Sequence, residues 1–437
     1  MSVSVAYAPN HTGTFLAHES EVRSYCRRMP RVFTRGRNAH VWDEAGTEFI
    51  DFFSACGSLN YGHNDALIKQ AALDHLESDS IICGLDLHTS AKRNFIDAFQ
   101  RIVLAPRGLD YKLQFPGPTG TNAVEAALKL ARKVTKRHNV VAFSRGFHGM
   151  TLGALAATYN KQARLGAGVP LTHVTRLAYE NDEDCGFPSL DAFAARFESA
   201  TAEAGAPAAF LVETVQGEGG LHVASKAWLQ RLAALAKRLG SLLIVDDIQA
   251  GCGRTGPFFS FERAGIKPDI VCLAKSLSGL GLPMALVLIK PTWDKWSPGE
   301  HNGTFRGNNL AFATATAALG YWEQASFLGQ KEQSETLVQA WLEMKSRIYH
   351  SYGVSARGQG LMAGLRFAYP GQAEAVARET FKRNVLIETA GQNDDVLKLM
   401  PPLTIPHDVL IEGLERISQA IDAVLPVSDT ASQTLAA

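Results

Sequence analysis

Short apolar runs alternate with helical patterns through the middle of the chain. Four such runs, at residues 139–143, 210–212, 242–245 and 270–274, are typical of strands buried on both faces. Apolar residues at helical spacing lie between them, for example over residues 228–239. The alternation of strand and helix predicts an α/β fold with a mostly parallel sheet, which binds ligands at the carboxyl ends of its strands.

The two ends of the chain have a different pattern. Two short strands around an Asp-Glu-Ala-Gly turn predict a hairpin over residues 41–51. Beyond about residue 330, a long helical stretch at 334–349 precedes a hairpin-like run at 358–369, which predicts a second, smaller α+β unit. The small, polar residues 428–437 predict a disordered tail.

A proline- and glycine-rich turn at residues 114–122 precedes a predicted amphipathic helix. Asn122, with Glu125 three residues later, is typical of a helix start with a capping partner. A glycine–threonine turn at a helix start can also bind an anion, because free N–H groups and the helix dipole point at one spot. The stretch lacks the lysine of a P-loop, so an ordinary capped helix and an anion site both remain open.

Composition narrows the class of function. Of 437 residues, 43 are Lys or Arg and 43 are Asp or Glu, so no basic field for nucleic acid or an anionic membrane is expected. Residues 1–10 lack the features of a secretory signal, and no apolar run approaches the ~18 residues of a membrane helix. Six scattered cysteines without a C-x-x-C pair argue against a metal site or disulfides, and for a cytoplasmic enzyme acting on small molecules.

Lys275 follows the apolar run 270–274, and small residues come directly after it. A lysine at the end of a core strand is costly as a bare cation, and burial favours the neutral amine that can form an imine. Taken alone, it is more typical of a surface lysine at a strand exit. Two other predicted strands end in acids, Glu213 and Asp246. Because strand side chains alternate, Asp246 and Asp247 are expected to point to opposite faces.

A lysine, an aspartate and a phosphate-type helix start together fit the needs of pyridoxal phosphate. In combination these motifs resemble the class III (ω-amino-acid) aminotransferases of fold type I over about residues 32–424. Residues 246–256, Asp-Asp-Ile-Gln-Ala-Gly-Cys-Gly-Arg-Thr-Gly, are similar to that family's D-E-x-Q-x-G-x-G-R-T-G. The resemblance implies pyridoxal 5'-phosphate as cofactor, a large domain at 65–330, and a small α+β domain formed by 1–64 and 331–437.

The resemblance also implies roles for single residues. Lys275 matches the lysine that binds the cofactor covalently, Asp246 the partner of its pyridinium nitrogen, and Gln249 a neighbour of its phenolic oxygen. The remaining cofactor contacts are the phosphate turn at Gly120 and Thr121, the ring-stacking Phe147, and Thr304, which matches a threonine that reaches the phosphate of the neighbouring subunit. That last match implies a homodimer with shared active sites.

Within the class, residues 59–64, 84–89, 107–112 and 115–125 most resemble the diaminobutyrate branch. That branch interconverts L-aspartate 4-semialdehyde plus L-glutamate with L-2,4-diaminobutyrate plus 2-oxoglutarate in ectoine biosynthesis. Ornithine-type members have an arginine at the position of Lys398, shielded by a glutamate that Glu218 matches, and a substrate-contacting tyrosine at the position of Cys56. Our hypothesis is that Lys398 holds the substrate carboxylate as a point charge, with Glu218 as its gate.

Other functions remain open at this stage. The same transamination can serve siderophore or antibiotic assembly, and ornithine, N-acetylornithine or 4-aminobutyrate can replace diaminobutyrate as the amino donor. A racemase or decarboxylase on the same fold would not depend on an oxo acid. A non-catalytic relative has no reason to retain Lys275, Asp246 and Gln249 together.

Overall fold

Seven strands form the central sheet of the computed structural model, which describes residues 12–197 and 205–425. In sheet order they are β4 (Lys112–Gln114), β12 (Leu286–Ile289), β11 (Ile270–Leu273), β10 (Leu242–Asp246), β7 (Ala209–Val212), β5 (Val140–Phe143) and β6 (Val174–Leu177). All neighbouring pairs from β11 to β6 are parallel, whereas β12 is antiparallel to both β11 and β4. The predicted α/β fold with a mostly parallel sheet is therefore confirmed.

Both faces of this sheet are buried, as the unbroken apolar runs predicted. Leu243 and Val245 pack with the side chains of α10 (Lys226–Arg238) on one face. Leu242 and Ile244 point the other way and pack with α6 (Gly120–Thr135). This alternation fixes which residue at the end of each strand reaches the functional edge of the sheet.

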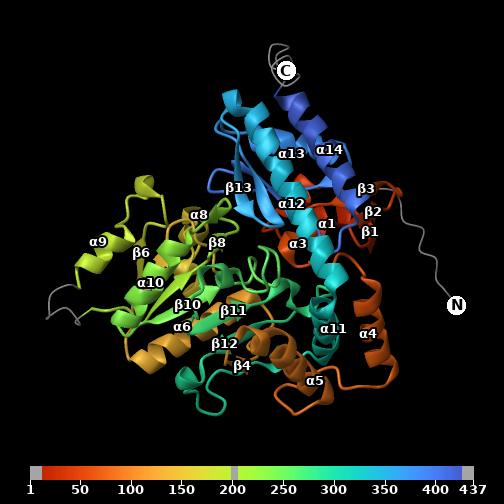
Figure 1. Cartoon of the computed structure of the whole chain (residues 1–437). Coiled ribbons are helices and arrows are strands. Elements are labelled where there is room, and N and C mark those ends of the chain that lie inside the picture. The colour runs from red at the N-terminus through yellow and green to blue at the C-terminus, as the bar shows by residue number, and fades with distance from the viewer. Residues whose placement is uncertain (1–11, 198–204, 426–437) are drawn as a thin grey trace.

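Shorter helices surround these layers, and α11 packs against α4 and α5 on the flank opposite α9 (Figure 1). Their bounds are α4 (Ala66–Glu77), α5 (Ser90–Ala98), α7 (Leu152–Ala157), α8 (Lys161–Leu165), α9 (Leu190–Ala195) and α11 (Asn309–Leu319). A small hairpin of β8 (Val215–Gln216) and β9 (His222–Val223) follows β7 and carries a glycine-rich turn.

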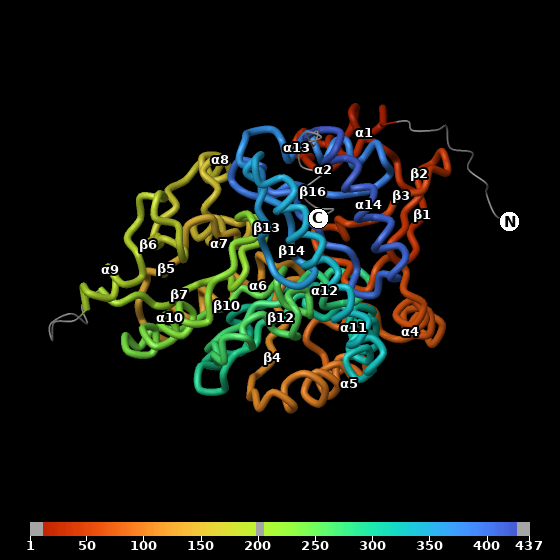
Figure 2. The backbone as a smooth tube through the Cα atoms, turned by 45° about the horizontal axis from the view of Figure 1, so that its top comes forward, coloured from red at the N-terminus to blue at the C-terminus, as the bar shows by residue number. Residues whose placement is uncertain are grey.

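The two ends of the chain combine into a second body, in which red and blue segments lie together (Figures 1 and 2). One of its sheets contains β1 (Phe33–Arg37), β2 (His40–Asp43), β3 (Glu48–Asp51) and β15 (Val385–Leu386). The other contains β13 (Ser355–Gln359), β14 (Met362–Arg366), β17 (Val396–Leu399) and β16 (Glu388–Ala390). The helices of this body are α1 (Gly13–His18), α2 (Tyr25–Arg28), α3 (Ser54–Gly57), α12 (Ala325–Ile348), α13 (Gln372–Lys382) and α14 (His407–Val424).

Several local predictions can be compared with these elements. The hairpin near residues 41–51 is confirmed as the antiparallel pair β2–β3. The run at 358–369 overlaps the antiparallel pair β13–β14, which begins earlier, at Ser355, and ends at Arg366. The helix start at Asn122 was wrong: α6 begins at Gly120, and Asn122 accepts a hydrogen bond from the hydroxyl of Thr119. The domain boundaries 1–64, 65–330 and 331–437 stay a prediction. The predicted tail at 428–437 lies outside the described residues.

Within residues 12–197 and 205–425, no helix is both long and apolar enough to cross a membrane. All six cysteines lie in this described part and are free thiols.

Candidate active site

A pocket of about 280 Å³ opens at the carboxyl ends of the parallel strands. Its walls come from the loops after β5, β7, β10 and β11 and from the start of α6. Seven of the ten residues singled out from the sequence line it, namely Gly120, Thr121, Phe147, Glu218, Asp246, Gln249 and Lys275. The three others, Cys56, Lys398 and Thr304, do not line it.

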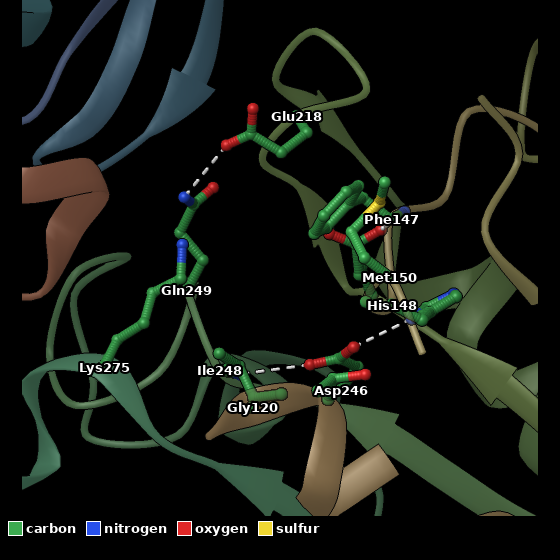
Figure 3. A pocket seen from close by; sticks show the side chains of 12 residues that line it. Gly120, Phe147, His148, Met150, Glu218, Asp246, Ile248, Gln249 and Lys275 are labelled. Carbon is green, nitrogen blue, oxygen red and sulfur yellow. Dashed lines mark hydrogen bonds and ion pairs between the residues drawn. The ribbon is translucent and has the colours of Figure 1, made fainter. Parts of the chain in front are cut away.

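Asp246 ends β10 and presents its carboxylate at the base of the pocket (Figure 3). The ring Nδ1 of His148 donates a hydrogen bond to Asp246 Oδ2 at 2.8 Å, and both side chains are buried. Asp247 points to the other face, as predicted, and accepts hydrogen bonds from the backbone and hydroxyl of Ser260. Burial raises the pKa of Asp247 to about 7, so this acid belongs to the core and not to the pocket.

Glu213 links two of the loops that form the pocket. Its Oε2 accepts the N–H of Phe147 at 2.9 Å, and its Oε1 accepts the N–H of Gly217 at 3.3 Å. Burial raises the pKa of Glu213 to about 7, against the opposing charge of His148. The sequence indicated Glu213 only as the end of a strand, and its hydrogen bond to Phe147, 66 residues away, could not be inferred from one sequence.

The first turn of α6 faces the pocket with free backbone donors. Thr119 is the residue before the helix, and its side chain does not cap the N–H groups. A Cβ on Gly120 would lie 3.1 Å from Ile248, and one on Gly149 would lie 2.3 Å from the hydroxyl of Thr121. Glycine at these positions lets the backbone approach closely, as an anion site at a helix start requires.

Lys275 stands on the opposite side of the pocket from Phe147 (Figure 3). Its Nζ donates a hydrogen bond to the backbone oxygen of Cys56 at 3.1 Å. The side-chain amide of Gln249 donates to that same oxygen at 3.1 Å and to Glu218 Oε1 at 3.2 Å. Cys56 thus contributes to the site through its main chain, although its side chain lies outside the pocket.

An unusual backbone conformation presents this oxygen. Ser54, Ala55 and Cys56 have φ values of 46°, 48° and 57°, and Gly57 follows at 78°. Three left-handed non-glycine residues in a row cost roughly 1–2 kcal/mol each. Such strain persists only where the surroundings enforce it, and it is common at functional sites.

A group of four side chains adjoins the pocket beyond Gln249, and we call it the distal cluster: Cys56, Glu218, Glu388 and Lys398. Lys398 Nζ lies 2.9 Å from Glu218 Oε1 and 2.8 Å from Glu388 Oε1. The thiol of Cys56 donates to the other oxygen of Glu388 at 3.4 Å. Lys398 is fully buried, and a lysine in that position requires carboxylate partners.

The charges in this cluster depend on one another. Burial acts to lower the pKa of Lys398, but Glu218 and Glu388 raise it well above its usual range. Burial acts to raise the pKa of Glu218, but the charges of Lys398 and Lys275 bring it down to about 2. Lys398 is therefore an ammonium group and Glu218 a carboxylate at neutral pH.

Sequence reasoning missed three residues of this region, His148 as the partner of Asp246, Glu388, and Tyr25. Glu388 could have been predicted from the sequence, because a buried lysine on one strand requires an acidic partner and a neighbouring strand can supply it. The hydroxyl of Tyr25 lies near the Cys56 thiol and comes from the N-terminal segment. No local pattern in the sequence indicates that contact, because it joins two segments that meet only in the fold.

Thr304 is exposed on the surface, in a turn beside residues 82–85. Gly307 accepts a hydrogen bond from the N–H of Gly84, which ties the two loops together. The role that the resemblance implies for Thr304 concerns a neighbouring subunit, so its position outside this pocket does not contradict that role.

The residues present fit pyridoxal phosphate. Gln249 Oε1 is buried without a partner among the described residues, and its side chain lines the same pocket as Lys275, Gly120 and Gly149. A carboxylate, an amine, free helix N–H groups and an exposed aromatic ring, Phe147, all face one cavity. This donor set is the one that the cofactor's ring nitrogen, aldehyde, phosphate and ring face require.

Comparison with known proteins gives a consistent result. The family model described as Aminotransferase class-III matches residues 23–421. A protein of Vibrio cholerae named diaminobutyrate--2-oxoglutarate transaminase is 53% identical over 409 residues, which cover 93% of this chain and 99% of that protein. One of the same name from Halalkalibacterium halodurans is 50% identical over 415 residues, or 95% of this chain and 97% of that protein.

Solved structures share the same fold. The ornithine aminotransferase of Toxoplasma gondii superposes with a TM-score of 0.80 at 25% identity, covering 94% of each chain. A transaminase from the marine bacterium Virgibacillus superposes with a TM-score of 0.82 at 19% identity, covering 97% of this chain and 99% of that one. The fold is therefore that of the fold type I pyridoxal-phosphate transferases, as the sequence resemblance implied.

Proposed function

The chain belongs to the class III aminotransferases, and we propose that it interconverts L-aspartate 4-semialdehyde plus L-glutamate with L-2,4-diaminobutyrate plus 2-oxoglutarate. The observation that carries the choice of substrate is the identity of 50–53% with diaminobutyrate--2-oxoglutarate transaminases over more than nine-tenths of the chain. Pyridoxal phosphate is the cofactor of this class. A place in ectoine biosynthesis belongs to the same proposal.

When bound, the cofactor supplies an electron sink for the carbanion formed at the reacting carbon of the substrate. We assign to Asp246 the task of holding the proton on the ring nitrogen, with His148 keeping that carboxylate in position. Gly120, Thr121 and the free N–H groups of α6 are assigned to the phosphate, and Phe147 to the ring face. Gln249 is assigned to the phenolic oxygen.

Lys275 is the covalent attachment point and the proton carrier in this proposal. Its amine sits on a flexible stem inside the pocket, so after release it would carry a proton between the substrate carbon and the cofactor carbon. The backbone oxygen of Cys56 holds the amine through a 3.1 Å hydrogen bond. That bond limits the directions in which the amine can point.

Lys398 is assigned to the carboxylate at the far end of each substrate, and Glu218 to shielding it. The ion pair between them, at 2.9 Å, is the closed state of this gate. The far carboxylate of glutamate or 2-oxoglutarate replaces that of Glu218, whose side chain is 29% exposed and lines the pocket, whereas Lys398 is held in place by burial. In this arrangement one pocket accepts substrates that differ at their far ends.

We also propose a homodimer in which Thr304 reaches the cofactor phosphate of the neighbouring subunit. Exposed apolar side chains support an interface beside that turn, because large apolar patches on a surface mark contacts. They are Ile81, Ile82, Leu85, Leu87 and Phe305, on two loops joined by the hydrogen bond from Gly84 to Gly307. A cytoplasmic location is part of the same proposal, since free thiols are typical of a reducing compartment.

The test is to follow the visible absorbance of the purified holoenzyme while adding one amino donor at a time, without an oxo acid. The donors are L-2,4-diaminobutyrate, L-glutamate, L-ornithine, N-acetylornithine and 4-aminobutyrate. We expect the band of the bound cofactor to decrease with the first two and weakly with the others. A strong response to ornithine or 4-aminobutyrate instead would retain the class and exclude the substrate.

A further inference from the structure

The distal cluster contains two carboxylates and one ammonium group, and the two carboxylates are held differently. Glu388 lies directly opposite Lys398 in the ladder between β16 and β17, and its side chain is 1% exposed. Glu218 comes from the glycine-rich turn between β8 and β9, and it points into the upper part of the pocket (Figure 3). Strand register therefore fixes Glu388, whereas Glu218 lies in a turn and its side chain is 29% exposed.

The other groups of the cluster add no charge at neutral pH. Burial raises the pKa of the Cys56 thiol to about 12, helped by the nearby charge of Glu388. Burial also raises the pKa of the Tyr25 hydroxyl, which lies near that thiol outside the cluster. The fixed pair of Glu388 and Lys398 is thus neutral in sum, and the net charge of these four side chains resides on Glu218. The charge of Lys275, outside the cluster, also acts on Glu218, and in the proposed function this lysine is bound to the cofactor.

We propose that Glu388 is a positioning residue that determines substrate specificity: by neutralising Lys398, it leaves Glu218 as an unbalanced carboxylate that recognises the α-ammonium group of the substrate. This inference rests on the proposed function. Diaminobutyrate and aspartate semialdehyde carry an ammonium and a carboxylate on the same far carbon. Lys398 and Glu218, 2.9 Å apart, match such a pair of opposite charges.

Glutamate and 2-oxoglutarate carry only a carboxylate at their far end. For these substrates Glu218 turns away, and Lys398 remains protonated because Glu388 stays beside it at 2.8 Å. A buried ammonium group without that fixed partner would favour its neutral form and lose its hold on the carboxylate. Glu388, which stays in place, and Glu218, which can be replaced, thus allow one site to bind both kinds of substrate.

A matched pair of donors isolates the α-ammonium group. 4-Aminobutyrate differs from 2,4-diaminobutyrate only by lacking the α-amino group, so the ratio of their kcat/KM values with 2-oxoglutarate measures its recognition. In Glu388→Gln, Glu218 becomes the sole counter-ion of Lys398 and no carboxylate is left unbalanced. We expect the ratio of diaminobutyrate to 4-aminobutyrate to fall about 10- to 100-fold, the worth of a charged hydrogen bond.

Two variants serve as controls for this measurement. Asp395→Asn removes a carboxylate from the ion pair with Arg366 in the same part of the fold, away from the pocket, and is expected to leave the ratio unchanged. Glu388→Asp retains the charge and is expected to restore most of the ratio. The ratio of the dissociation constants of the two donors is expected to change in the same way among these variants. It is measured by calorimetry in a Lys275→Ala background, where turnover is blocked.

The outcomes separate this inference from the proposed function. The inference is overturned and the proposed function stands if the natural enzyme uses diaminobutyrate and Glu388→Gln leaves two ratios of the donors unchanged: that of their kcat/KM values and that of their dissociation constants. If the natural enzyme does not use diaminobutyrate, both are overturned.

A double variant covers the case in which Glu388→Gln does not fold. In Glu388→Met with Lys398→Met, apolar side chains replace the neutral pair, an exchange that buried ion pairs often tolerate. Glu218 keeps its charge, so the ratio is expected to survive while the KM for glutamate rises. Loss of the ratio in this variant overturns the inference.

Discussion

Replacing Lys398 by methionine alone should destabilise the protein, by an amount that depends on pH. The substitution leaves the carboxylate of Glu388, which is 1% exposed, with the Cys56 thiol at 3.4 Å as its remaining polar neighbour in the distal cluster. Breaking a buried ion pair by removing one partner costs about 3–5 kcal/mol, because the other charge stays buried. Glu218 adds little to this cost, since its side chain can turn toward solvent.

The pH dependence follows from the pKa of Glu388. Burial already raises that pKa in the folded protein, against the opposing charge of Lys398, so removing the lysine raises it further. A carboxyl group whose pKa is higher in the folded state contributes stability that is present below its unfolded pKa, about 4.3, and lost as pH rises through the folded value. The variant should therefore lose little stability near pH 5 and the full amount near pH 8.

The assay is the urea midpoint of unfolding at pH 5 and pH 8 for the natural chain, for Lys398→Met, and for the double variant with Glu388→Met. The double variant should recover most of the loss at pH 8, because no charge is left buried. An equal loss at both pH values, or a double variant no more stable than the single one, would refute this reasoning.

Three further predictions concern the walls of the pocket. His148→Ala removes the 2.8 Å hydrogen bond to Asp246, so we expect kcat to fall about 10- to 100-fold and the cofactor to dissociate more readily, as followed by visible absorbance. Gly217→Ala would place a methyl group 1.5 Å from Gln249 Oε1, so we expect that amide to be displaced and half-reaction rates with both glutamate and diaminobutyrate to fall. Ala55→Gly removes a left-handed alanine at φ 48° and should raise the free energy of unfolding by roughly 1 kcal/mol, as seen in the urea midpoint, with unchanged KM values.

The sequence predicted the central sheet well because its strands are buried on both faces. Continuous apolar runs such as 242–245 leave few alternatives, and the acids at their ends mark where the chain leaves the core. The start of α6 was harder to place. Asn122 and Glu125 have the spacing of a capping pair, but the helix begins two residues earlier, where glycine permits close packing against Ile248.

The residues missed in the site share one physical reason. His148 reaches Asp246 from the loop after β5, and Tyr25 approaches Cys56 from the N-terminal segment. These contacts depend on how separate elements pack, and nothing in the local sequence encodes them. Glu388 differs from these two residues. It lies opposite Lys398 in the pairing of two short strands, and a search for the counter-ion of Lys398 would have paired those strands.

The parallel pairing of β3 with β15 also bears on how the chain is made. Ile50 lies opposite Val385 in this pairing. Strand β3 is therefore synthesised early, whereas its partner β15 leaves the ribosome only near the end of synthesis. The strands of the central sheet lie between these two and can assemble first. Until then β3 presents an unpaired edge, which is a site for association with other chains. We therefore expect nascent chains to depend on chaperones, and truncations before residue 385 to lose the substrate end of the pocket while the sheet that carries the cofactor site folds.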